Sequence, residues 1–101
     1  MNHKSFLFLQ TRAPLEAGPE AFDLALTAAA FDHDVRLVLA DDGVHWLRPG
    51  LPELVEEAID QIAVEQESLA ERGIAAPPGI ALVAREELAA LLAGSDVVVT
   101  G

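Results

Sequence analysis

The chain has 101 residues and a formal net charge of -11, from 17 acidic and 6 basic residues. This length suits one small domain over residues 1–101. So acidic a surface repels phosphate backbones and anionic membranes, which argues against direct binding to nucleic acid or to a membrane. No apolar run is long enough to span a membrane, and the apolar segment near the start is too short for a secretory leader. We therefore expect a soluble, cytoplasmic protein.

The 101 residues contain no cysteine. Thiolates serve as nucleophiles and as zinc ligands, so a thiol nucleophile, a thiolate metal site and a disulfide are all excluded for this chain. The sequence also lacks zinc-ligand spacing, a Ser-His-Asp set and a nucleotide-binding loop. The residues therefore predict no metal and no cofactor.

The first elements alternate between strand and helix. Residues 5–11 are the first expected strand, because residues 6–9 form an apolar run that is typical of a strand covered on both faces. Residues 12–18 are expected to be a loop, because Pro14 and Gly18 interrupt regular structure. A helix is predicted over about residues 19–31, and its two apolar stripes indicate one face on the sheet and another on a body such as a neighbouring subunit.

A second buried strand, at about residues 35–40, ends in Asp41-Asp42-Gly43, which is turn chemistry. Loops at the carboxyl ends of strands are where ligands and partners meet an open α/β sheet. Paired acids can bind Mg²⁺, as in receiver-like domains. In those domains the pair follows the first strand, whereas here it follows the second. We therefore favour a turn or a partner contact for Asp41 and Asp42.

Three further residues lie near strand ends. A lone histidine such as His45 is more often a surface or packing residue than a catalyst. Trp46, the only tryptophan, is either an anchor for another subunit or a cover for the sheet edge. Under the anchor alternative, replacing Trp46 with Ala should weaken assembly and leave the fold intact. Arg12 follows the first strand and can meet an anion there, although no Gly-rich loop supports this.

Residues 52–72 fit two patterns. One is a single long helix, which the periodicity of the apolar residues favours. The other is a short helix at about 52–60, a strand at 61–65 and a short helix at 67–72. Beyond Gly73, a strand at 80–84, a helix at 85–93 and a strand at 96–100 complete the chain. Such alternation predicts a parallel sheet flanked by helices.

Four segments carry a resemblance to a known family: residues 5–9, residues 21–31, Asp41-Asp42-Gly43-Val44, and Ser68-Leu69-Ala70-Glu71-Arg72-Gly73. In order and setting they resemble the DsrE/DsrF-like sulfur-relay family, most closely its TusC/DsrF branch. The resemblance implies an α/β fold of three layers, with a five-stranded, mostly parallel sheet and helices on both faces. It also favours the strand at 61–65 over the long helix.

The resemblance implies a role in sulfur trafficking. Members of that family assemble as heterohexamers in which one subunit carries persulfide sulfur on a cysteine, for tRNA 2-thiouridine synthesis or for sulfur oxidation. The family's cysteine lies at the carboxyl end of the third strand, where this chain has Glu65. A persulfide needs a thiol, so the implied role is a non-catalytic subunit of a TusBCD/DsrEFH-like complex. The implied partners are cysteine-bearing DsrE-like and DsrH-like subunits, or further copies of the chain.

Two alternatives complete the predictions. Glu65 and Glu67 can be acid–base residues, although solvated carboxylates at a strand end are favoured. The chain can also be a stand-alone, homo-oligomeric small-molecule-binding domain of the same fold, with a closed pocket near Arg12, Asp41 and Glu65. In either function, the residues expected at a partner surface or pocket rim are Arg12, Asp41, Asp42, Gly43, His45, Trp46 and Glu65.

Overall fold

A computed structural model describes residues 4–18 and 20–101, and within these ranges five strands form one sheet. The strands are β1 (Ser5–Gln10), β2 (Asp34–Leu39), β3 (Gln61–Glu65), β4 (Ala81–Val83) and β5 (Val97–Thr100). The helices are α1 (Pro14–Ala17), α2 (Asp23–Ala30), α3 (Glu53–Ala58), α4 (Gln66–Glu71) and α5 (Arg85–Gly94), with a 3₁₀ helix, η1 (Asp41–Leu47), after β2. The strand order is β4-β3-β2-β1-β5, and every neighbouring pair is parallel.

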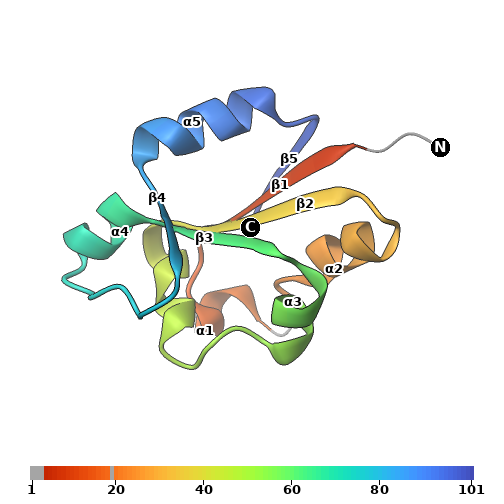
Figure 1. Ribbon diagram of the computed structural model, residues 1–101. Helices are drawn as coiled ribbons and strands as arrows, with labels where there is room; N and C mark the ends of the chain where they lie inside the picture. Colours follow the sequence, from red (N-terminus) through yellow and green to blue (C-terminus); the bar gives the residue numbers. More distant parts are fainter. Residues whose placement is uncertain (1–3, 19) are drawn as a thin grey trace.

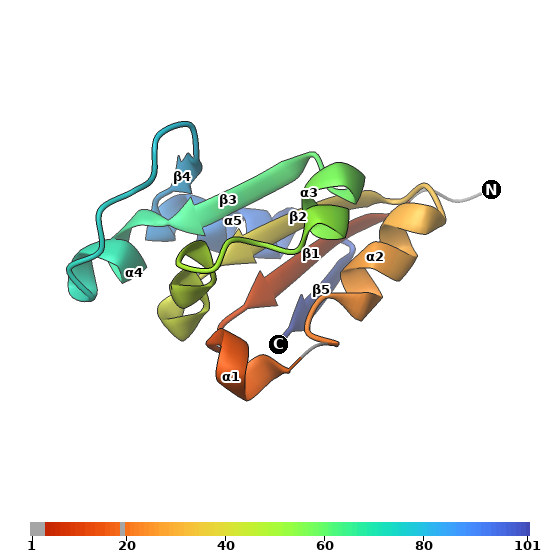
Figure 2. The same cartoon turned by 90° about the horizontal axis from the view of Figure 1, so that it is seen from below.

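The elements lie in three layers. Helices α1, α2 and α3 lie on one face of the sheet, and α5 covers the other (Figure 1). Strands β1 to β4 follow one another across the sheet, whereas β5 returns to the free side of β1. The carboxyl ends of all five strands therefore point toward the same edge (Figure 2). The predicted α/β fold with helices on both faces is confirmed, and the sheet is wholly parallel.

The core has two parts, one on each face of the sheet. Phe8 and Leu37 belong to the larger cluster, under α2 and α3, whereas Leu7 and Val38 pack with Leu88 of α5. Successive side chains of a strand point to opposite faces, so β1 and β2 need apolar residues at nearly every position. This explains the uninterrupted apolar runs in the sequence.

The strand at Gln61–Glu65 is confirmed, and the single long helix is wrong. β3 lies between β2 and β4, where Ile62 pairs with Leu37 and Val64 pairs with Leu39. Val64 is fully buried. A helix over the same residues would leave β2 without a neighbour on this side, so pairing in the sheet decides between the two patterns.

Two boundaries in the first half differ from the predictions. The segment expected to be a loop contains α1, because Pro14 occupies the first helical turn, where its missing N–H costs nothing. Gly18 ends this helix with a φ of 78° and donates its N–H to the Pro14 carbonyl. The next helix, α2, begins at Asp23. The predicted start at Pro19 lies outside the described residues.

The outer side of α2 keeps large apolar side chains at the surface. Leu24 is 64% exposed and Phe31, at the end of the helix, is 72% exposed, whereas Ala28 is buried. Packing of this stripe against another subunit stays a prediction. Within the described residues, no helix has both the length and the apolar character that a membrane crossing needs.

Candidate functional site

Glu65 lies on the carboxyl edge of the sheet, at the end of the second of its five strands counted from β4. It is the last residue of β3, and its side chain is buried, with 4% of the residue exposed. Its Oε1 accepts one hydrogen bond from the Ser68 hydroxyl at 2.5 Å and another from the Arg85 guanidinium at 3.0 Å. The expectation of a solvated carboxylate at this position is wrong, because these two donors replace water around the charge.

Ser68 joins two elements through one buried hydroxyl. Its Oγ donates to Glu65 and accepts the backbone N–H of Asp41 at 2.8 Å. The start of η1 is thereby fixed to the end of β3 and the first turn of α4. Asp41 itself has a φ of 50°, which an aspartate tolerates better than most residues. The Asp-Asp-Gly turn therefore opens a 3₁₀ helix whose position depends on Ser68.

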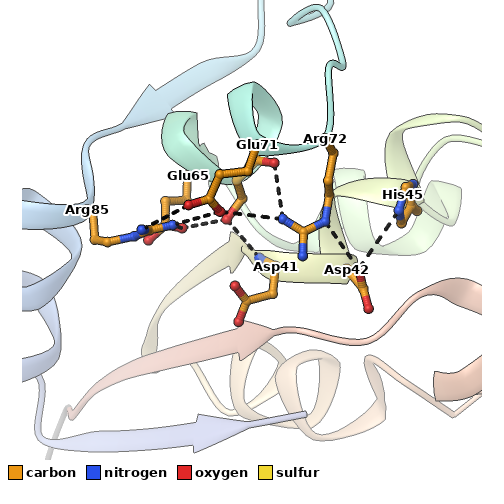
Figure 3. Close-up of polar contacts among 8 residues, drawn as sticks. Asp41, Asp42, His45, Glu65, Glu71, Arg72 and Arg85 are labelled. Atoms are coloured by element: carbon orange, nitrogen blue, oxygen red, sulfur yellow. Dashed lines mark hydrogen bonds and ion pairs between the residues drawn. The ribbon is translucent and has the colours of Figure 1, made fainter.

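An ion-pair chain extends from Glu65 across the edge (Figure 3). Arg85 lies 3.2 Å from Glu71, and Glu71 lies 3.7 Å from Arg72. Arg72 in turn contacts Asp42 at 3.1 Å. His45, beside Asp42, and Ser68, bonded to Glu65, extend this chain at its two ends. We call these residues together the strand-end network: Asp42, His45, Glu65, Ser68, Glu71, Arg72 and Arg85. Most of its pairs are exposed, so each contributes little stability and the network acts mainly by orienting its members.

The charges at the centre of the network are mutually stabilised. Burial raises the pKa of the Glu65 carboxyl, but the hydrogen bonds from Arg85 and Ser68 outweigh it, and the pKa lies below its ordinary value. Hydrogen bonds to Glu65 and Glu71 raise the pKa of the Arg85 guanidinium above its ordinary value. Both groups are therefore charged at neutral pH. A carboxylate held ionised by two donors is poorly suited to accept a proton as a general base.

Trp46 belongs to the core and not to an exposed rim. It is 8% exposed, its ring meets Phe22 edge-on at a centroid distance of 4.8 Å, and its indole N–H donates to the Arg12 carbonyl at 3.0 Å. Of the two alternatives, the side chain therefore has the covering role. The expectation that Trp46→Ala would spare the fold is corrected, because this substitution opens a cavity beside Phe22.

Gly43 is required by a close backbone approach. A Cβ at this position would lie 1.9 Å from the carbonyl oxygen of Gln10. The end of β1 and the first turn of η1 therefore touch through backbone atoms, as only glycine permits. Gly43 is buried and serves packing, whereas Asp41 and Asp42 beside it are exposed.

Apart from the buried Gly43 and Trp46, the predicted rim residues divide into two groups. Asp41, Asp42, His45 and Glu65 lie at or beside the strand-end network. Arg12 lies at the end of β1, where it lines a separate cavity of about 400 Å³ that neither Asp41 nor Glu65 lines. This cavity is therefore not the single closed pocket that was predicted near Arg12, Asp41 and Glu65.

Four members of the network were not predicted as site residues: Ser68, Glu71, Arg72 and Arg85. Ser68, Glu71 and Arg72 belong to the segment that carries the family resemblance, which was the one available signal. Arg85 reaches Glu65 from 20 positions further along the chain, and nothing local marks it. Among residues 4–18 and 20–101, no cluster of three or more histidine, aspartate or glutamate side chains is arranged to hold a metal ion.

Comparison with known proteins identifies the family. The sequence pattern of the DsrE/DsrF-like family matches residues 4–100. The chain belongs to the DsrE/DsrF-like family. The crystal structure of the ychN protein from E. coli resembles this DsrE/DsrF-like chain with a TM-score of 0.66 and 23% sequence identity, over 99% of this chain and 100% of that one. At this identity the likeness shows the fold alone. No curated protein matches the sequence.

Proposed function

We propose that this DsrE/DsrF-like chain is a non-catalytic subunit of a sulfur-relay complex, of the TusC/DsrF kind. Membership of the family supports a role related to sulfur relay. The observation that carries the proposal is the state of Glu65: a buried, doubly hydrogen-bonded carboxylate ends β3 in a chain without cysteine. By the family resemblance, this is the position of the carrier thiol. The chain would therefore support transfer on a partner's cysteine and carry no sulfur itself.

The geometry suits a supporting role. The strand-end network connects η1, α4 and the first residue of α5, so three elements keep fixed positions around the end of β3. Asp41 and Asp42 remain exposed on this edge. A cysteine-bearing DsrE-like or DsrH-like subunit docked here would meet a preorganised surface. The sulfur would go on to tRNA 2-thiouridine synthesis or to sulfur oxidation.

Reconstitution tests the proposal. The purified chain is mixed with cysteine-bearing DsrE-like and DsrH-like subunits and a persulfide donor, and sulfur transfer is followed by mass spectrometry of each subunit. We expect a mass increase of one sulfur atom on a partner only, and faster transfer when this chain is present. Equal transfer with and without the chain would contradict a supporting role.

A second candidate function is a stand-alone, homo-oligomeric small-molecule-binding domain. The specific observation in its favour is the cavity of about 400 Å³ beside Arg12, a size within the range of ligand sites. The two functions differ in where they place the important surface. The relay role uses the ends of β2 and β3, whereas ligand binding uses the ends of β1 and β5.

A further inference from the structure

The cavity beside Arg12 lies where ligand sites form in open α/β sheets. It is lined by β1, β5 and Leu37 of β2, and by residues of α1, α2 and the segment between them. The strand order reverses between β1 and β5: β1 leads to α1 and α2 on one face, and β5 arrives from α5 on the other. Crevices outside the carboxyl ends of strands at such a reversal are common binding places. In Figure 2 the end of β5 lies between α1 and α2.

The floor of this cavity is apolar. Phe8, Leu37 and Val99 supply side chains from three adjacent strands, and Phe22 adds a second aromatic ring from the start of α2. Phe8, Phe22 and Leu37 belong to the larger core cluster, so this part of the lining is held by packing. The floor suits a branched aliphatic or aromatic group.

Gln10 adds a buried polar group with unused hydrogen-bonding capacity. The residue is 3% exposed and lines the cavity. Its amide nitrogen donates once, in a long contact of 3.4 Å to the Ala21 carbonyl, and its Oε1 accepts the Arg12 N–H at 3.1 Å. An amide has two N–H donors and two lone pairs on oxygen, so one donor and one lone pair remain for a ligand.

The charged lining has both signs. Arg12 supplies a guanidinium, and Glu16 and Glu20 supply carboxylates. Within residues 4–18 and 20–101, none of these three side chains has an ion-pair partner within 4.0 Å. A purely anionic ligand would face two carboxylates in a chain of net charge -11. A ligand with both a carboxylate and an ammonium matches the lining on each side.

We propose that this cavity binds a free α-amino acid with an apolar side chain. The ligand carboxylate would meet Arg12 and the spare Gln10 N–H, the ammonium would meet Glu16 or Glu20, and the side chain would lie on Phe8, Phe22 and Val99. The inference does not depend on the relay role. It gives the second candidate function a ligand class, and its test uses the isolated chain without any sulfur-carrying partner.

Calorimetry with three probes tests the ligand class. The probes are L-phenylalanine, 3-phenylpropanoate, which lacks the ammonium, and 2-phenylethylamine, which lacks the carboxylate. We expect L-phenylalanine to bind, and each truncated probe to bind about tenfold more weakly or worse, because each loses a charge-assisted hydrogen bond. Equal binding of either truncated probe, or no binding of L-phenylalanine at millimolar concentration, would overturn the proposal.

Matched variants place the ligand in this cavity. Arg12→Gln should weaken L-phenylalanine binding by about tenfold or more, whereas Arg48→Gln, at an exposed arginine outside the lining, should leave it unchanged. Glu16→Gln combined with Glu20→Gln should also weaken binding, with Glu57→Gln as the control. Circular dichroism of each variant verifies the fold. Equal effects in test and control variants would show that L-phenylalanine binds elsewhere and would overturn the proposal. A homo-oligomer that closes the cavity and excludes the probe would also overturn it, because a second copy of the chain would then occupy the cavity.

Discussion

Among the glycines of the described residues, Gly43 has the least room for a side chain. An added Cβ would lie 1.9 Å from the Gln10 oxygen and 2.7 Å from the Gln10 carbonyl carbon, and both are backbone atoms that no side-chain rotation can move. We expect Gly43→Ala to lower the free energy of unfolding by about 3 kcal/mol or more, measured by urea denaturation. Gly94→Ala is the control, because an added Cβ there meets nothing within 4 Å. Similar losses in both variants would contradict the close approach.

The Glu65 carboxylate makes stability depend on pH. Its pKa is lower in the folded protein than in the unfolded chain, so the stabilisation is fully present above the unfolded pKa of about 4.3. It is lost as the pH falls through the folded pKa. We expect Glu65→Gln to cost about 1 to 3 kcal/mol at pH 7, and the difference from the parent chain to shrink below about pH 4.

Urea denaturation at several pH values measures this dependence. Glu57→Gln, at an exposed position on α3, is the control and should follow the parent chain at every pH. If the Glu65→Gln difference stayed constant from pH 7 to pH 3, the ionised, hydrogen-bonded state of Glu65 would be refuted.

At the scale of elements, Trp46 packs η1 against the start of α2 and the segment after β1. Its ring contacts Phe22 at the start of α2, and its N–H bonds the Arg12 carbonyl after β1. We expect Trp46→Ala to cost about 3 to 5 kcal/mol in unfolding free energy, followed by circular dichroism. Trp46→Phe keeps an aromatic ring and loses the hydrogen bond, so its cost should be clearly smaller. Little change in unfolding free energy in Trp46→Ala would contradict this core role.

The elements also show why sequence reasoning succeeded unevenly. The alternation of apolar runs and helical segments was enough to predict the parallel sheet. Periodicity could not separate β3 from a long helix, because the spacings among Ile59, Ile62 and Leu69 fit helical turns. The pairing of Ile62 and Val64 with β2 is a long-range property. The family resemblance, not the local pattern, favoured the strand.

Prediction of the candidate site was also limited by contacts between segments that are distant in the sequence. Asp42, His45 and Glu65 were expected at one edge, because adjacent parallel strands end on the same side of a sheet. The burial of Glu65 was missed because it depends on Arg85, which follows β4. The choice between the two alternatives for Trp46 stayed open because the burial of its ring depends on the turn of η1. Contacts between distant segments decided both outcomes.

At the scale of the whole molecule, the surface combines strong acidity with large exposed apolar side chains. The net charge is -11, and Leu24 on α2, Phe31 directly after it and Leu54 on α3 are each more than half exposed. Apolar groups of this size at the surface of a small chain favour burial against another subunit. Self-repulsion between copies of so acidic a chain supports the proposal of different partners over identical ones.

Native mass spectrometry of the complex isolated from its source tests the central claim most directly. A non-catalytic relay subunit should appear in an assembly whose mass is the sum of this chain and cysteine-bearing DsrE-like and DsrH-like chains. Dissociation in the gas phase should release persulfide sulfur only with the cysteine-bearing chains. A chain found alone, as a monomer or as a homo-oligomer without such partners, would contradict the account.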